Sequence, residues 1–203
     1  MIKSIIFDWS GTLSNNIHAF KQVCDVIFTK FGRELISIEE IQANFDMPYM
    51  KFWNKYIPEL SKEEQNKLYE ETIHKADNAL VYDGVLEVIQ ELNKKGIQLF
   101  VVSSDYKSKI ISEAKEYKIF HFFKEIIFEI HEKEHALLKL IKKHNLDINQ
   151  TIYVGDTSGD IHAGKKAGLK TAGISWGFQN KEKLAQAKPD FLIDDIKEIK
   201  KIF

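Results

Sequence analysis

The chain has 203 residues, of which 44% are hydrophobic and 29% are charged, and its formal net charge is −1. This length is enough for one large domain or for one domain with a modest insertion, and the composition is typical of a globular protein. The balanced charge gives no reason to expect a nucleic-acid or membrane surface. One cysteine, Cys24, excludes an intrachain disulfide. Without a signal peptide or a membrane-length apolar run, the sequence predicts a cytoplasmic protein.

The first element expected along the chain is a buried strand. The apolar run Ile5-Ile6-Phe7 reaches a carboxylate, Asp8, and the turn-forming pair Gly11-Thr12 follows shortly after it. A short apolar run before such a turn predicts a strand that is buried on both faces. Open α/β sheets bind their ligands at the carboxyl ends of strands. Asp8 is therefore the first candidate functional residue.

Residues from about 15 to 80 carry only helical patterns. Apolar side chains recur at helical spacing over residues 17–31, and residues 14–16 before them predict an N-cap. Two further helices are expected to open with capping boxes, formed by Ser37 with Glu40 and by Ser61 with Glu64. This block is predicted to be all-helical.

From residue 82 onward, short apolar runs alternate with helical patterns. We expect strands at residues 97–102, 126–128, 151–154, 171–175 and 191–193. Strands that alternate with helices predict an α/β fold, a doubly wound parallel sheet with helices on both faces. We therefore assign residues 1–14 and 82–203 to an α/β core. Residues 15–81 are assigned to a small helical cap that is inserted after the first strand.

Polar residues follow several of these strands and can converge in one crevice. Asp8 and Asp156 each end a strand, and Asp160 lies one helical turn further on. Carboxylate oxygens of this kind suit Mg²⁺. The Ser103 hydroxyl and the Lys133 ammonium could hold an anion beside that ion. A cation site around an anion and a carboxylate nucleophile suggests phosphoryl transfer.

These residues resemble the motifs of the haloacid dehalogenase superfamily. Phe7-Asp8-Trp9-Ser10-Gly11-Thr12-Leu13 resembles the first motif, Val101-Val102-Ser103-Ser104 the second, Lys133 the third, and Val154-Gly155-Asp156-Thr157-Ser158-Gly159-Asp160 the fourth. The segment Ile174-Ser175-Trp176-Gly177-Phe178 is similar to the phosphoglycolate phosphatase-like branch. The resemblance covers essentially the whole chain. It implies a Rossmann-like core and a cap that closes over the substrate, hinged near residues 14–16 and 79–83.

The resemblance also implies a function, that of an Mg²⁺-dependent hydrolase of small phosphorylated metabolites. Asp8 would attack phosphorus and become an aspartyl phosphate, and Ser10, Ser103 and Lys133 complete the expected catalytic set. Mg²⁺ would be held by Asp8, the Ser10 backbone carbonyl and Asp156, with Asp160 in support. Substrate binding is assigned to Thr12, Ser104 and Lys51. We expect no nucleic-acid or membrane partner, and a monomer or a homodimer.

Ser10 departs from the family pattern. Most phosphatases of the family carry a second Asp two residues after the nucleophile, which protonates the leaving group and then activates water. A serine hydroxyl is a poor base, and general acid–base catalysis is typically worth roughly 10²–10⁴-fold. The chemistry at Asp8 is therefore either slowed or matched to a substrate that needs no acid. His18 is one candidate replacement for the acid.

Two alternative functions stay open. Phosphonoacetaldehyde hydrolases have a small residue at this position and use a cap lysine that forms a Schiff base with the substrate. The segment Met47-Pro48-Tyr49-Met50-Lys51 resembles the one that bears this lysine, so Lys51 could support carbon–phosphorus bond cleavage. The other alternative is a catalytically weakened member that binds a phosphorylated ligand or a protein partner, which Ser10 would favour.

Overall fold

A parallel sheet forms the centre of the molecule in the computed structural model, which describes residues 1–130 and 132–202. Within these residues the main sheet has six strands in the order β5-β4-β1-β6-β7-β8. The strands are β1 (Ser4–Phe7), β4 (Gln98–Val102), β5 (Phe123–Ile127), β6 (Thr151–Gly155), β7 (Lys170–Ile174) and β8 (Phe191–Ile193). Each neighbouring pair is parallel. The predicted doubly wound sheet is confirmed.

Strand β1 is central because it is apolar on both faces. Ile5, Ile6 and Phe7 are each at most 1% exposed. Successive side chains of a strand point to opposite faces, so Ile5 and Phe7 join one core cluster and Ile6 joins another. Phe7 is in register with Val101 of β4 and Val154 of β6. The residues that follow these three strands therefore lie together at one edge of the sheet.

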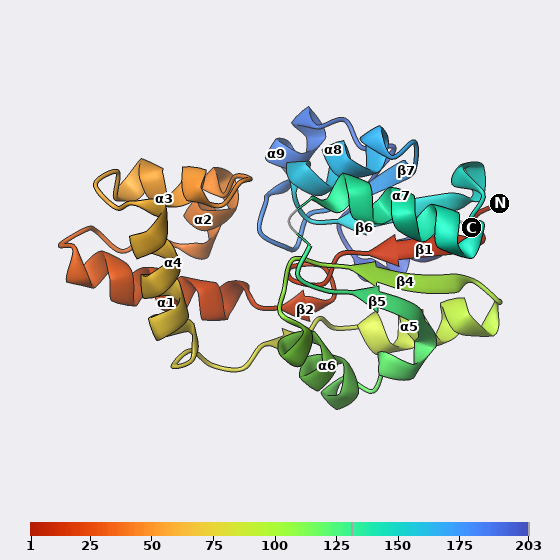
Figure 1. The fold of residues 1–203 in the computed structure, drawn as a ribbon, viewed down its shortest axis with the longest axis horizontal. Helices are drawn as coiled ribbons and strands as arrows, with labels where there is room; N and C mark the ends of the chain where they lie inside the picture. The colour runs from red at the N-terminus through yellow and green to blue at the C-terminus, as the bar shows by residue number, and fades with distance from the viewer. Residues whose placement is uncertain (131, 203) are drawn as a thin grey trace.

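Helices cover both faces of the sheet (Figure 1). One face carries α5 (Val85–Lys94) and α6 (Lys107–Glu116), and the other carries α7 (Lys133–His144), α8 (Ser158–Lys166) and α9 (Lys181–Gln186). Short 3₁₀ turns lie at Phe120–Phe122, Ile148–Gln150 and Ile196–Lys201. No helix in the described parts of the chain is both long enough and apolar enough to span a membrane.

The helical cap stands beside the sheet as a separate layer (Figure 1). It comprises α1 (Ile17–Lys30), α2 (Ile38–Asn44), α3 (Met50–Tyr56) and α4 (Lys62–Ile73). The cap has its own buried cluster, which includes the aromatic side chains Phe20, Phe28, Phe45, Phe52 and Trp53. Because these rings are buried within the inserted segment, the cap packs largely around itself.

Two short strands join the cap to the core at the segments predicted as hinges. β2 (Ser14–Asn15) pairs antiparallel with β3 (Leu80–Val81). This pairing lies where the chain leaves the core and where it returns. The division of the chain at residues 14/15 and 81/82 stays a prediction.

The local helix signals have mixed outcomes. Ser61 and Glu64 form the predicted capping box, and the Ser37 hydroxyl accepts from the Glu40 N–H as expected. The N-cap of α1 falls at Asn16, within the predicted residues 14–16, but the Asn16 side chain makes no capping hydrogen bond. Asn16 Oδ1 instead accepts from the Gly11 N–H at 3.0 Å, and its Nδ2 donates to Ser10 Oγ at 2.8 Å. Asn16 thus supports the loop after β1.

Candidate active site

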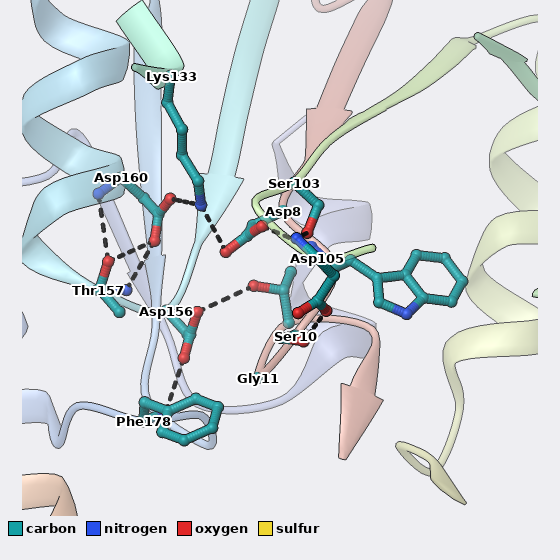
Figure 2. A network of polar contacts seen from close by, with 12 residues as sticks. Asp8, Ser10, Gly11, Ser103, Asp105, Lys133, Asp156, Thr157, Asp160 and Phe178 are labelled. Carbon is teal, nitrogen blue, oxygen red and sulfur yellow. Dashed lines mark hydrogen bonds and ion pairs between the residues drawn. The ribbon is translucent and has the colours of Figure 1, made fainter. Parts of the chain in front are cut away.

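Asp8 lies at the carboxyl end of β1 and is only 6% exposed. Its N–H donates to the Val154 carbonyl at 2.8 Å, which continues the β1–β6 pairing by one residue. The Trp9 N–H donates to Asp8 Oδ1 at 2.8 Å. Lys133 Nζ lies 2.8 Å from Asp8 Oδ2. The carboxylate is therefore held by one backbone donor and one cation, as Figure 2 shows.

Asp160 is buried at the first turn of α8 and holds its neighbours in place. Its Oδ1 accepts from Lys133 Nζ at 2.6 Å and from the Tyr153 hydroxyl at 2.9 Å. Its Oδ2 accepts from the N–H and the hydroxyl of Thr157, with which it forms a capping box. Both oxygens are already engaged by protein donors, and the support of Mg²⁺ expected of Asp160 stays a prediction.

Asp156 follows β6 and is fully buried. Its Oδ2 accepts from the Phe178 N–H at 2.7 Å, and the Thr12 hydroxyl approaches its Oδ1 at 3.4 Å. Two glycines make room for this side chain, because a Cβ atom at Gly11 or at Gly177 would overlap the Asp156 carboxylate. Gly11 also has a φ of +74°, which disfavours any other residue.

The negative charge of this cluster exceeds its positive charge. Oxygen atoms of Asp8, Asp156 and Asp160 all lie within 4.8 Å of one another, whereas Lys133 is the cation that bonds to two of them. Burial, with the charge of Asp160 added and that of Lys133 opposing, raises the pKa of Asp8 to about 7. Burial and the other two carboxylates also raise the pKa of Asp156. A divalent cation bound by oxygen ligands fits this buried excess of negative charge.

Lys133 and Asp160 stabilise each other as an ion pair. Burial would raise the pKa of Asp160, but the Lys133 ammonium and the hydrogen bonds from Thr157 and Tyr153 hold it below its usual range. Burial would lower the pKa of Lys133, but Asp160 and Asp8 outweigh it and raise that pKa. Lys133 therefore remains a cation at the edge of the Asp8 carboxylate.

Ser10 belongs to a second polar cluster on the other side of the loop. Its hydroxyl donates to Asp105 Oδ2 and accepts from Asn16 Nδ2 and from Lys109 Nζ, the latter at 3.1 Å. Lys109 Nζ also lies 3.0 Å from Asp105 Oδ2. Asp105 precedes α6, and Lys109 lies on that helix four residues later. All three hydrogen-bonding positions of the Ser10 hydroxyl are thus occupied.

Residues further along the same face of α6 contact the loop after β1. Glu113 Oε2 accepts from Trp9 Nε1 at 2.6 Å, and the Tyr117 ring stacks on Trp9 at a centroid distance of 6.1 Å. These residues follow Asp105 and Lys109 at intervals of four, so they line one face of the helix. Side chains on α6 and at its two ends therefore contact Trp9 and Ser10 from one side of the loop.

The other predicted residues lie in different environments. Ser103 is buried after β4, beside β1 in the sheet, and its hydroxyl accepts from the Asp105 N–H at 3.2 Å. Thr12 is buried and is directed at Asp156, as noted above, whereas Ser104 is exposed. Lys51 is exposed on α3. Burial lowers the pKa of Lys183, and the charge of Lys51 acts in the same direction. Within the described residues no hydrogen bond or ion pair links Lys51 to the Asp8 cluster.

His18, the candidate replacement for the acid, is exposed near the start of α1. Cys24 is buried in the cap cluster, where burial raises the pKa of its thiol, so it is an unreactive core residue.

A loop of the core contacts both the cap and Asp156. The Phe178 ring packs against Phe20 and Phe45 of the cap, at centroid distances of 5.4 and 4.8 Å, while its N–H binds Asp156. The fully buried Gln179 side chain donates to the Phe45 carbonyl at 2.9 Å and accepts from the Ser158 N–H at 2.7 Å. Seating of the cap and orientation of Asp156 therefore depend on the same loop.

Sequence reasoning missed several members of the site, above all Asp105, Lys109, Tyr153 and Phe178. A signal for the first two was present, because Asp105 directly follows Ser103-Ser104 and Lys109 comes four residues later. Tyr153 carried only the signal of a buried strand. Phe178 was assigned to a family-like segment but not to a partner.

Residues 5–174 match the family described as haloacid dehalogenase-like hydrolase, so the chain belongs to that family. The predicted membership is confirmed.

Individual relatives align over nearly the whole chain. A phosphoglycolate phosphatase of Vibrio cholerae serotype O1 is 28% identical over 214 residues, which cover 96% of this chain and 94% of the relative. A pyrophosphatase PpaX of Anoxybacillus flavithermus is 29% identical over 206 residues, covering 98% and 95%. A solved haloacid dehalogenase-like hydrolase of Streptococcus pneumoniae has a TM-score of 0.84 at 23% identity, covering 100% of this chain and 98% of that one. This similarity confirms the predicted fold.

Proposed function

We propose that the protein is an Mg²⁺-dependent phosphatase of small phosphorylated metabolites that works through an aspartyl phosphate on Asp8. The observation that carries this proposal is the buried cluster in which Asp8 meets Lys133 and lies beside Asp156. The names of the relatives, a phosphoglycolate phosphatase and a pyrophosphatase, agree with phosphoryl transfer. Carbon–phosphorus cleavage through Lys51 gains no support, since Lys51 is exposed.

Each group in the cluster has a distinct task in this proposal. Asp8 attacks phosphorus, and its carboxylate is aimed by the Trp9 N–H. Lys133 and the Ser103 hydroxyl bind oxygens of the phosphoryl group and offset its charge. Mg²⁺, held by Asp8, the Ser10 carbonyl and Asp156, would neutralise charge that develops on the transferred group.

Asp160 completes the set without touching the substrate. Its contacts with Lys133, Tyr153 and Thr157 keep the lysine extended toward Asp8. A fixed cation that needs no reorganisation during the reaction stabilises the transition state more than a mobile one.

Replacing the nucleophile tests the proposal. Asp8→Asn preserves the shape of the side chain but removes the attacking oxygen anion, so turnover of a panel of phosphate monoesters and anhydrides with Mg²⁺ should be lost. Intact-mass spectrometry after rapid acid quench should find the phosphorylated chain in the parent protein and not in Asp8→Asn.

The matched control is Asp25→Asn, which removes a partly exposed carboxylate that pairs with Lys21 on α1. This variant should turn over at the parental rate, because partly exposed ion pairs contribute little. Inactivity of the parent protein across the whole panel, or equal turnover by Asp8→Asn, would contradict the proposed function.

A further inference from the structure

We propose that Glu113 is a positioning residue for the nucleophile and that it acts through the indole ring of Trp9. This inference rests on the proposed function, because it concerns how Asp8 is held for attack on phosphorus. The observation that carries it is the hydrogen bond that Trp9 Nε1 donates to Glu113 Oε2 at 2.6 Å. This bond joins α6 to the residue directly after the nucleophile, although Glu113 lies outside the motifs found in the sequence.

The indole ring of Trp9 is enclosed by the core and is 0% exposed. The Tyr117 ring stacks on it at a centroid distance of 6.1 Å and an interplanar angle of 8°, and the Phe123 ring meets it edge-on at 6.4 Å. These two rings hold the plane of the indole. The hydrogen bond to Glu113 adds a directional contact within that plane, because N–H···O bonds weaken steeply when they bend. Glu113 therefore fixes where the indole lies.

The backbone of Trp9 organises the loop that follows β1. Its carbonyl accepts from the N–H groups of residues 12–14, at 3.2, 2.9 and 3.0 Å. Its N–H donates to Asp8 Oδ1 at 2.8 Å, while Lys133 holds the other carboxylate oxygen. A shift of Trp9 therefore moves the donor that orients the Asp8 carboxylate, together with the turn behind it.

Loss of this orientation should slow the chemical step and leave phosphate binding unchanged. A misplacement of about 1 Å near the reacting atoms costs about a hundredfold in rate. Lys133 and Ser103, the proposed phosphoryl-binding residues, come from α7 and from the end of β4. Within the described residues no hydrogen bond or ion pair links either of them to Glu113.

Glu113→Leu removes the acceptor and leaves the Trp9 indole N–H without its partner. The kcat for 4-nitrophenyl phosphate with Mg²⁺ should fall by about 10- to 100-fold. Rapid-quench mass spectrometry should find slower phosphorylation of Asp8. Calorimetry should find the parental dissociation constant for inorganic phosphate. A merely structural role for Glu113 would lower the unfolding free energy in urea and leave the kcat of the folded protein unchanged.

Glu113→Gln is the rescue variant. Its amide oxygen can accept from the same indole N–H, whereas the negative charge beside Lys109 is lost. This variant should keep the parental kcat. A kcat as low as that of Glu113→Leu would show that the charge and not the hydrogen bond matters, and would overturn the inference.

Trp9→Phe tests the same bond from the other end, because it removes the indole N–H and keeps an aromatic ring. Addition of Glu113→Leu to Trp9→Phe should lower kcat no further, since two residues that act through one bond are not additive. If Glu113→Leu alone fails to fold, Trp9→Phe should itself lower kcat with parental phosphate affinity. A full further loss in the double variant would overturn the role of the bond.

Glu116→Leu is the matched control, since Glu116 is exposed on the same helix three residues later. It makes the same chemical change away from Trp9 and should leave the parental kinetics unchanged.

The outcomes separate this inference from the proposed function. A parent protein that forms no phosphorylated chain overturns both. A parent protein that forms it, with a folded Glu113→Leu variant of parental kcat, overturns the role of Glu113 and leaves the function intact.

Discussion

The polar groups on the two sides of Asp8 differ in their burial and in the elements that supply them. On the side of Asp156 and Asp160 the charges are buried, and each carboxylate has fixed donors from core elements. On the side of Ser10 the polar groups are partly exposed and come from the loop after β1, from α6 and from the start of α1. The proposed phosphoryl site is thus preorganised inside the core, whereas the polar groups around Ser10 lie at its partly exposed edge.

The Ser10 hydroxyl makes contacts that do not extend to the buried ion pair of Lys133 and Asp160. A substitution of Ser10 is therefore expected to leave that ion pair unchanged. The same reasoning predicts that a change at the buried side has a larger effect.

Gly11→Ala is expected to have the largest effect on the buried side. The added Cβ would overlap Asp156, and the φ of +74° adds backbone strain of about 1 kcal/mol or more. We expect phosphatase turnover and Mg²⁺ binding by calorimetry to fall by about a hundredfold or more, since a displaced group near the reacting atoms has costs of that order.

Gly32→Ala is the control, because Gly32 has a φ of +63° and no atom lies within 4 Å of its added Cβ. This variant should show the strain alone, as a modest loss of stability in urea, with parental Mg²⁺ affinity. Equal Mg²⁺ affinity in both variants would refute the crowding at Asp156.

Phe45→Ala tests whether the cap supports the buried side through Phe178. Loss of the Phe45 ring removes a partner of the Phe178 ring, whose N–H binds Asp156. We expect the Mg²⁺ dissociation constant to rise by about tenfold, a coupling of about 1.4 kcal/mol. Calorimetric titration of the substrate-free protein measures this directly.

Phe28→Ala is the matched control, since Phe28 lies in the same cap cluster but packs on Trp53 and Tyr56. Both variants create a cavity and should lose about 3–5 kcal/mol of unfolding free energy. If Phe28→Ala weakens Mg²⁺ binding as much as Phe45→Ala does, cap stability rather than the Phe178 contact controls the site.

The smallest expected effect is a dependence of Mg²⁺ affinity on pH. Burial raises the pKa of Asp8 to about 7, so below neutral pH this carboxyl tends to hold a proton that the ion must displace, and the raised pKa of Asp156 acts in the same direction. Affinity should therefore fall several-fold from pH 8 to pH 6, with release of protons on binding at the lower pH. An affinity that is constant over this range would contradict the shifted pKa values.

Much of the buried side could be predicted from the sequence, because its geometry follows from strand periodicity. Asp8, Ser103 and Asp156 each follow a buried strand, and parallel strands bring their carboxyl ends to one edge. Asp160 and Lys133 were found because they lie at the starts of helices that follow such strands. The helical cap was readable from the absence of strand patterns between residues 15 and 80.

The partners of Ser10 and Asp156 were decided only by the tertiary structure. Asn16 had the sequence signal of a helix cap, yet the Gly11 N–H and Ser10 Oγ compete successfully for its side chain. Asp105 meets Ser10 because β4 lies next to β1, and Phe178 meets Asp156 because a loop far along the chain returns beneath the cap. Such loop contacts have no periodicity, so only packing of the complete chain selects them.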